Sequence, residues 1–313
     1  MTIYLGVDGG GSGTVLCLVT AAGEVIAEAD APSCYYLDTS SGEGAELVER
    51  VLVEAVAHVC ALAGVRPADI TYAFFGLPAY GEVSADVPTL DAAPRSALGH
   101  DRYRCDNDMV CGWAGSLALA DGINVISGTG SMTYGRRGDT GIRVGGWGEL
   151  FGDEGSGYWI GIRGLQAFSQ MSDGRLPPGP LLDVLREHLD LTSDLDLVDI
   201  VLNSWRGSRR AIAALSRPIV HAATLQDPAA LLIIDEAATE LVRLVETTRT
   251  RLDFTPTVPV PVSYSGGVLT APEVLRVFTH KLTAQDHPYD LRTPIHTPAI
   301  GAAHYAATLS GGI

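Results

Sequence analysis

Lysine is almost absent from this sequence, since Lys281 is the only one in 313 residues. A Walker A phosphate loop needs a lysine directly after its last glycine, and a protein kinase needs one on an early strand. Neither pattern occurs here. A nucleoside triphosphate would therefore have to be bound by backbone N–H groups or through a metal ion.

Cysteine and histidine are also sparse. The chain has 5 cysteines, an odd number, and no Cys-x-x-Cys pair, which argues against a disulfide framework and against a zinc ribbon. Its 8 histidines are scattered and include no His-Glu-x-x-His motif. The sequence therefore predicts no dedicated zinc site.

Positive charge is scarce, with 21 lysines and arginines against 37 aspartates and glutamates and a formal net charge of −16. Nucleic acid is not expected as a partner, because phosphate backbones demand basic patches. No apolar run reaches the roughly 18–20 residues of a membrane span, so no membrane partner is expected either. The N-terminal residues lack the pattern of a secretory signal, which favours the cytoplasm.

The length suits two domains of roughly 150 residues each. At the N-terminus, residues 2–8 form an apolar strand that ends in Asp8, and residues 9–13 form a glycine-rich turn. Residues 14–20 and 25–29 predict two further strands. This antiparallel ribbon differs from the strand–turn–helix unit of dinucleotide-binding folds.

The same pattern returns in the middle of the chain. Residues 124–127 and 131–134 predict two strands around a turn at 128–130, and residues 141–144 predict a third. We interpret this as an internal duplication of a β-ribbon unit. Periodicity predicts the other elements, which are helices at 45–63, 109–120, 157–168, 181–189, 195–202, 211–225, 229–252, 272–282 and 298–309 and strands at 70–77, 103–105 and 258–265.

Both glycine turns are candidate phosphate-binding loops, because glycines in a tight turn leave backbone N–H groups free to donate to phosphate oxygens. The first loop comprises Gly9, Gly10, Gly11 and Ser12. The second loop comprises Ser127, Gly128, Thr129 and Gly130. Asp8, at the end of the first strand, is the candidate ligand of Mg²⁺, directly or through water. Each turn alone is also compatible with a plain hairpin, but two opposed loops can bind one polyphosphate.

The segment Asp106-Asn107-Asp108 lies between a predicted strand and a predicted helix. A sugar hydroxyl has a pKa far above neutrality, so its attack on a γ-phosphate is helped by a carboxylate that accepts its proton. We predict that Asp108 is this general base. Asp106 or Asn107 is alternatively only the N-cap of the helix, and the two roles are compatible.

Two further glycine-rich segments are candidate binding sites. Residues 145–156 contain Trp147, which needs to pack or stack, and Asp153, which we predict to bind ligand hydroxyls. Glu154 precedes a helix, where a carboxylate is favourable on electrostatic grounds alone. The glycines at 266–267 follow a strand and allow a flat ring to lie against the backbone.

These segments, in this order, resemble the N-acetylglucosamine kinase family of the BadF/BadG/BcrA/BcrD ATPase group, within the actin/hexokinase/Hsp70 superfamily. The most specific part is Gly-Gly-Trp-Gly followed by Gly-Asp-Glu-Gly-Ser, with Ser-Gly-Thr-Gly-Ser upstream. The resemblance implies an α/β, two-domain actin-like ATPase (ribonuclease H-like) fold with duplicated β-ribbon sheet units and an interdomain cleft. The N-terminal domain would span residues 1–108, with a helix at about 297–310 packed back on it, and the C-terminal domain residues 109–296.

The resemblance also implies a reaction, which is the ATP-dependent phosphorylation of N-acetylglucosamine to its 6-phosphate by a Mg²⁺-dependent homodimer. Asp108 would be the general base, and both glycine loops would bind the phosphates of ATP. Gly266 and Gly267 would border adenosine. The positions that would contact the sugar are Cys34, Asp108, Thr129, Gly146, Trp147 and Asp153.

The sequence departs from this family at several positions. The first loop usually reads Gly-Gly-Gly-Thr-Lys-Thr, but Ser12 and Gly13 replace its threonine and lysine, so that one positive charge is missing. Cys34 and Met132 stand where asparagine is often found, and both are poor hydrogen-bonding groups. Since sites that bind hydroxyls by hydrogen bonds discriminate strongly, glucosamine or a related hexose derivative is the alternative substrate.

Two functions without sugar phosphorylation also stay open. One is an ATPase activator of a dehydratase, which holds an iron–sulfur cluster between subunits through cysteines. The spacing of the cysteines offers no pair for it, although single cysteines from two subunits are compatible with a cluster. The other is a non-catalytic sugar sensor, against which the presence of Asp108 argues.

Overall fold

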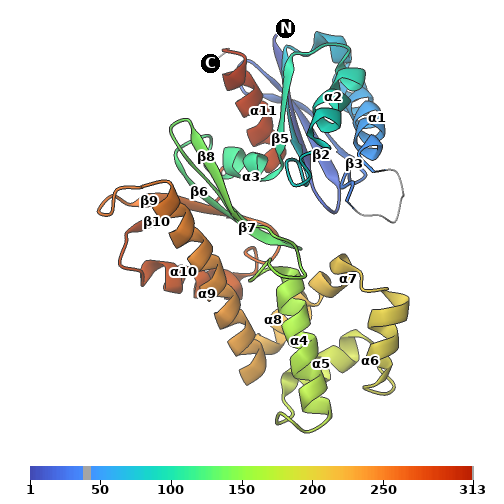
Figure 1. Ribbon diagram of the computed structural model, residues 1–313, viewed down its shortest axis with the longest axis vertical. Coiled ribbons are helices and arrows are strands. Elements are labelled where there is room, and N and C mark those ends of the chain that lie inside the picture. Colours follow the sequence, from blue (N-terminus) through green and yellow to red (C-terminus); the bar gives the residue numbers. More distant parts are fainter. Residues whose placement is uncertain (38–43, 312–313) are drawn as a thin grey trace. The chain divides into compact units, whose positions relative to one another are not determined.

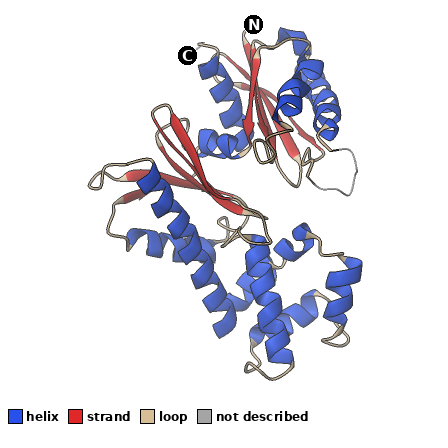
Figure 2. Cartoon of the chain, in the orientation of Figure 1, coloured by secondary structure: helices blue, strands red, loops and turns tan. Residues whose placement is uncertain are grey.

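The computed structural model describes residues 1–37 and 44–311, which divide into two units (Figure 1). The first unit comprises Met1–Ala120 and Thr293–Ile313, and the second comprises Asp121–Arg292. Each unit contains a five-stranded sheet with helices packed against it (Figure 2). In the described ranges, no helix combines the length and the apolar character that a membrane crossing requires.

The sheet of the first unit begins with the predicted ribbon. β1 (Ile3–Gly9), β2 (Thr14–Thr20) and β3 (Val25–Ala31) pair antiparallel in chain order. β4 (Tyr72–Leu77) pairs parallel to β1, and β5 (Tyr103–Asn107) pairs parallel to β4. The resulting order is β3-β2-β1-β4-β5, so that the carboxyl ends of three parallel strands lie at one edge of the sheet.

Helices pack on this sheet, and one of them was not predicted from the sequence. α2 was missed because Pro88 and Pro94 interrupt its helical pattern, although a proline in the first turn is tolerated. The α-helices of the unit are α1 (Glu46–Ala63), α2 (Val87–Leu98), α3 (Met109–Ser116) and α11 (Pro298–Leu309).

α11 approaches β1 and α3 closely because glycines face it. A Cβ on Gly6 would lie 2.2 Å from the carbonyl oxygen of Ala299, and a Cβ on Gly301 would lie 2.0 Å from the backbone nitrogen of Gly115. Any larger residue at these positions would push the helix away. The chain thus returns at its C-terminal end to complete the first unit (Figure 1).

α3 also belongs to the first unit, because it packs against α11. Its Trp113 packs edge-on against Tyr305 of α11, with ring centroids 5.7 Å apart. The first unit therefore ends at Ala120, later than the predicted boundary at residue 108, and the predicted helix at 109–120 ends early, at Ser116.

The sheet of the second unit repeats the arrangement of the first. β6 (Gly122–Ser127), β7 (Ser131–Arg137) and β8 (Thr140–Gly145) pair antiparallel in chain order. β9 (Val260–Ser265) pairs parallel to β6, and β10 (Tyr289–Leu291) pairs parallel to β9. The order of this sheet is β10-β9-β6-β7-β8. Read from its other edge, as β8-β7-β6-β9-β10, it matches the order β3-β2-β1-β4-β5 of the first sheet strand for strand. The predicted duplication is confirmed and extends beyond the ribbon to the whole sheet.

The helices of the second unit differ from the predicted ones at two places. The single helix expected at 211–225 is two helices that meet at Leu215, and the helix expected at 195–202 is a short α-helix continued by a π-turn at Ile200–Ser204. The α-helices are α4 (Gly157–Ser172), α5 (Pro180–His188), α6 (Asp196–Asp199), α7 (Arg209–Ala214), α8 (Ser216–Thr224), α9 (Pro228–Arg251) and α10 (Pro272–Thr283).

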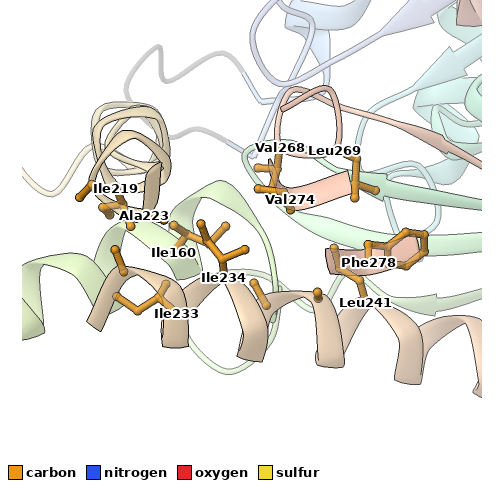
Figure 3. Packing of buried hydrophobic residues seen from close by; sticks show 14 of the residues in the cluster. Ile160, Ile219, Ala223, Ile233, Ile234, Leu241, Val268, Leu269, Val274 and Phe278 are labelled. Atoms are coloured by element: carbon orange, nitrogen blue, oxygen red, sulfur yellow. The ribbon is translucent and has the colours of Figure 1, made fainter. Parts of the chain in front are cut away.

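Residues of five helices, α4, α5, α8, α9 and α10, pack with residues of β6 and β9 in the core of this unit, part of which Figure 3 shows. Ile160, Ile219 and Ile234 come from three different helices and are almost completely buried. The buried carboxylate of Asp227 joins two helices, since it accepts hydrogen bonds from the N–H of Ala230 in α9 and of Leu181 in α5. Such capping fixes the ends of helices that would otherwise leave N–H groups unpaired.

Candidate functional site

The register of the first sheet brings two acidic segments to one edge. Asp8 at the end of β1 pairs with Gly76 of β4, and Gly76 pairs with Asp106 of β5. Asp108 follows directly and begins α3, where its N–H donates to the carbonyl of Leu77 at 3.3 Å. Asp8 and Asp108 therefore lie at the carboxyl edge of the same sheet, within electrostatic reach of each other.

Gly76 makes this arrangement possible. A Cβ on Gly76 would lie 2.2 Å from Sγ of Cys111 and 3.0 Å from Cα of Asp108. The start of α3 can therefore lie directly against β4. The side chain of Asn107 accepts a hydrogen bond from the N–H of Met109 at 3.2 Å, whereas Asp108 is the N-cap of α3 and its side chain makes no capping hydrogen bond. The asparagine therefore stabilises the start of the helix without being its N-cap.

The two carboxylates influence each other. Burial, and secondly the charge of Asp108, raise the pKa of Asp8 to about 7, against the smaller opposite effect of a hydrogen bond from Cys111. A divalent cation at Asp8 would offset this repulsion, so the residues fit Mg²⁺. Among residues 1–37 and 44–311, no group of three or more His, Cys, Asp or Glu side chains could hold a metal. Mg²⁺ in nucleotide sites is typically held by one or two carboxylates together with phosphates, which suits Asp8.

The raised pKa predicts a pH-dependent cost of Asp8 in the absence of a cation. The pKa of Asp8 is higher in the folded protein than in the unfolded chain. The free energy of unfolding therefore falls as the pH rises from about 4 to about 7. Between pH 5 and pH 8, the wild type should lose about 2–3 kcal/mol more of its unfolding free energy than Asp8→Asn does. Urea denaturation in EDTA at both pH values measures this. Equal pH dependence of the two proteins would contradict it.

The first loop is a tight turn on the same side of the sheet as Asp8. The N–H of Gly10 donates to the carbonyl of Gly13 at 2.8 Å, while Gly11 and Ser12 are exposed. The hydroxyl of Ser33 donates a hydrogen bond to the carbonyl of Gly10 at 2.8 Å. This bond ties the first loop to the segment that follows β3.

Cys34 lies beneath the first loop and is completely buried. Its Sγ is 2.7 Å from the place where a Cβ on Gly9 would be. Burial raises the pKa of its thiol to about 11, a hydrogen bond with Thr14 lowers it, and the charge of Asp108 raises it further. Cys34 is thus within electrostatic reach of Asp108, and its side chain packs in the core of the first unit.

The second loop is fixed by the segment that precedes α4. The hydroxyl of Ser127 donates to the carbonyl of Gly155 at 2.9 Å, and the hydroxyl of Ser131 donates to the carbonyl of Glu154 at 2.6 Å. The N–H of Gly157, the first residue of α4, donates to the carbonyl of Gly128 at 2.7 Å. Thr129 lies at the tip of this turn and is half-buried.

The turn that contains Gly266 rests directly on the second loop. Gly266 has a φ of +92°, and a Cβ there would lie 2.4 Å from the carbonyl oxygen of Ser127. The N–H of Val268 donates to that same oxygen at 3.0 Å. Gly267 is exposed, and a Cβ on it would meet nothing within 4 Å. The structure therefore joins the predicted phosphate and adenosine segments of the second unit into one surface.

The segment between β8 and α4 has a buried end and an exposed middle. Gly146 is buried, with a φ of +72°, and its carbonyl accepts a hydrogen bond from Arg143. Trp147 is 72% exposed, and its neighbours Leu150 and Phe151 are exposed as well. The tryptophan therefore does not pack within the second unit, which leaves its indole available to a ligand.

Asp153 is the buried acidic group of this segment. It is 2% exposed and has a φ of +58°, which is rare for a residue other than glycine. Its Oδ1 accepts from the N–H of Gly148 at 3.3 Å, and its Oδ2 accepts from the guanidinium of Arg209 at 2.5 Å. Burial raises the pKa of Asp153 and Arg209 lowers it. Arg209 stands 56 residues further along the chain and belongs to no motif, so no pattern of the sequence predicts this contact.

Known proteins with related sequences are kinases by name. The chain is 32% identical over 247 residues to the N-acetylmuramic acid/N-acetylglucosamine kinase of Clostridium acetobutylicum, which covers 77% of both chains. It is 28% identical over 312 residues, 96% of both chains, to the N-acetyl-D-glucosamine kinase of Dictyostelium discoideum.

The fold is likewise found in solved structures. A candidate N-acetylglucosamine kinase from Chromobacterium violaceum superposes with a TM-score of 0.74 at 23% identity, over 97% of this chain and 98% of that one. The sequence profile of the BadF/BadG/BcrA/BcrD ATPase family matches residues 5–306, nearly the whole chain. The expected resemblance is confirmed: this protein belongs to the BadF/BadG/BcrA/BcrD ATPase family.

Proposed function

We propose that this protein is an ATP-dependent amino-sugar kinase that converts N-acetylglucosamine into its 6-phosphate. The observation that carries the proposal is the place of Asp108, at the carboxyl edge of the first sheet and beside Asp8. One carboxylate can bind a cation there while the other accepts a proton. The names of the two sequence relatives support an N-acetylated amino sugar as the substrate.

Each residue has a distinct part in the proposed reaction. Asp108 accepts the proton of the attacking sugar hydroxyl. The backbone N–H groups of the first loop and of the second loop donate to the phosphates of ATP and stabilise charge on the transferring phosphoryl group. Mg²⁺ bound at Asp8 would neutralise phosphate charge. Gly266 and Gly267 leave room for adenosine beside the second loop.

Five residues are proposed to contact the sugar besides Asp108. Asp153 would accept hydrogen bonds from sugar hydroxyls, and the exposed ring of Trp147 would stack on the sugar. Thr129 and Gly146 would contribute a hydroxyl and backbone groups. Cys34 is buried near Asp108 and offers the sugar no strong hydrogen bond, so a sugar with a different substituent at that place is the alternative substrate.

The alternative of an iron–sulfur activator is disfavoured by the surroundings of the cysteines. Iron–sulfur clusters are held by thiolates. All five cysteines are buried, and burial raises the pKa of every one of these thiols. A cluster shared with a second subunit needs accessible, deprotonated thiols, which these residues do not offer.

A coupled ADP-release screen tests the proposal. The purified protein is assayed with ATP and Mg²⁺ over N-acetylglucosamine, glucosamine, N-acetylmannosamine, N-acetylmuramic acid and glucose, and without sugar. ADP release that depends on one amino sugar is expected, and mass spectrometry and NMR of the product identify the phosphorylated hydroxyl. ATP hydrolysis that no sugar accelerates would refute the kinase and favour an ATPase switch. The absence of any turnover would favour a sensor.

A further inference from the structure

Arg209 makes a charged contact that no motif of the sequence announces. Its Nη2 lies 2.5 Å from Oδ2 of Asp153, and its Nε lies 3.2 Å from Oε2 of Glu149. Asp153 is buried, whereas Arg209 and Glu149 are each about one-third exposed. An arginine between two carboxylates is held in one orientation, because its guanidinium is planar and its donors diverge.

Packing between α4 and α7 places Arg209 at this position. Gly161 of α4 faces α7, and a Cβ there would lie 2.2 Å from the carbonyl oxygen of Ile212. Ile212 itself is buried. Ser208 begins α7 by accepting a hydrogen bond from the N–H of Ala211. The first residue of α7 is therefore carried to the segment that precedes α4, which contains Asp153.

The ion pair also lies against the second loop. A Cβ on Gly130 would be 2.6 Å from Nη2 of Arg209 and 2.7 Å from Oδ2 of Asp153. Glycine at this position thus lets the pair lie directly on the phosphate-binding turn. A group at this place can act on both the sugar-binding carboxylate and the loop beside it.

The Asp153 carboxylate still has acceptor capacity. An ionised carboxylate offers about four acceptor sites. Arg209, the N–H of Gly148 and the backbone of Ser131 occupy three of them. A sugar hydroxyl can use the remainder, provided that the carboxylate is charged and correctly turned.

We propose that Arg209 is a positioning residue, which holds the Asp153 carboxylate as an ordered acceptor for sugar hydroxyls. This inference rests on the proposed function. The titratable groups that face the pair are Glu149, which neutralises part of the arginine charge, and Tyr158 of α4, which interacts with both Glu149 and Arg209. Burial raises the pKa of Asp153, so the loss of Arg209 removes the main influence that opposes protonation.

The kinetic test compares Arg209→Met with Arg210→Met. Arg210 is the next residue of the same helix and is exposed. Arg210→Met removes the same charge, so this variant is a matched control. Arg209→Met should raise the KM for the sugar about tenfold to a hundredfold, the usual loss for a hydrogen bond to a charged group. The KM for ATP should change less than the KM for the sugar, and the thermal unfolding midpoint should fall below that of Arg210→Met, because Asp153 is left buried without its charged partner. Equal sugar KM values in the two variants would overturn the inference.

The pH profile separates positioning from packing. In Arg209→Met, the acidic limb of kcat/KM for the sugar should move to higher pH, because Asp153 protonates more easily. Arg209→Lys keeps the positive charge but loses the diverging N–H donors of the guanidinium. It should therefore keep the acidic limb of the profile at the wild-type pH and show a KM for the sugar between those of the wild type and Arg209→Met. A packing role alone would leave the limb unmoved in both variants and would overturn the inference.

Carbon-13 NMR of aspartate-labelled protein gives a readout that needs no sugar. The Asp153 carboxyl resonance is assigned by its loss in Asp153→Asn, and its titration midpoint should be higher in Arg209→Met than in the wild type. An unchanged midpoint would overturn the inference even in an active kinase. If the wild type phosphorylates no sugar but the midpoint is still higher in Arg209→Met, the proposed function is refuted. The effect of Arg209 on the Asp153 carboxylate is then still supported.

Discussion

Asp108→Asn should remain folded and lower kcat by about 100- to 10 000-fold, the usual contribution of a general base. The amide has nearly the shape of the carboxylate but cannot accept the proton of the sugar hydroxyl. The KM for ATP should change little. Stability should not fall, because the charge of Asp108 raises the pKa of Asp8 and its removal relieves that repulsion. Steady-state ADP release and thermal unfolding measure the two effects.

Asp106→Asn is the matched control for this substitution. Asp106 is the last residue but one of β5 and is also a half-buried carboxylate, but its Oδ1 accepts a hydrogen bond from the N–H of Asn107 and its other oxygen lies 3.7 Å from Arg104. These are local structural contacts, so the control should keep near wild-type turnover. Wild-type turnover in Asp108→Asn, or an equal loss in both variants, would refute Asp108 as the base.

The parts that could be predicted from the sequence are those encoded by neighbouring residues. A glycine turn between two apolar strands specifies a ribbon locally, and the repeat of this pattern gave the duplication of the sheets. Asn107 ends β5 and Asp108 follows it directly, so their place at the carboxyl edge of the sheet was also a local inference. The family resemblance rested on the order of these segments, and the comparisons confirm the family.

The parts that escaped prediction depend on packing between distant elements. Arg209 reaches Asp153 only because α7 lies against Gly161 of α4, a contact that no local pattern encodes. β10 has only three residues, too few for a strand pattern, and it is defined by its pairing with β9. Hydrogen bonds between strands and contacts between helices decide such elements.

Individual side chains at predicted positions also needed the structure. Trp147 was expected to pack or stack, and it is largely exposed in the second unit. Cys34 was expected to face the sugar, and it is buried against Gly9. Sequence position fixes the place of a residue on its element, but the neighbours that pack on it decide its exposure.

Gly266→Ala should weaken ATP binding about tenfold to a hundredfold, because the backbone at this position cannot accept a side chain without strain. A Cβ at Gly266 would lie 2.4 Å from the carbonyl oxygen of Ser127, and the φ of +92° is unfavourable for any residue with a Cβ. The backbone must shift, and it carries the second loop with it, since Val268 is bonded to the same carbonyl. Calorimetric titration with a non-hydrolysable ATP analogue and Mg²⁺ measures the loss without any sugar.

Gly138→Ala provides the control in the turn between β7 and β8, outside the proposed site. Gly138 also has a positive φ, +57°, but a Cβ on it meets nothing within 4 Å, so this variant should bind the nucleotide like the wild type. A circular-dichroism melt shows whether each variant keeps the fold. If folded Gly266→Ala binds the analogue as well as Gly138→Ala does, the second loop does not depend on the glycine turn that rests on it. If Gly266→Ala alone loses affinity, the close contact between Gly266 and Ser127 holds the second loop in the shape that binds phosphate.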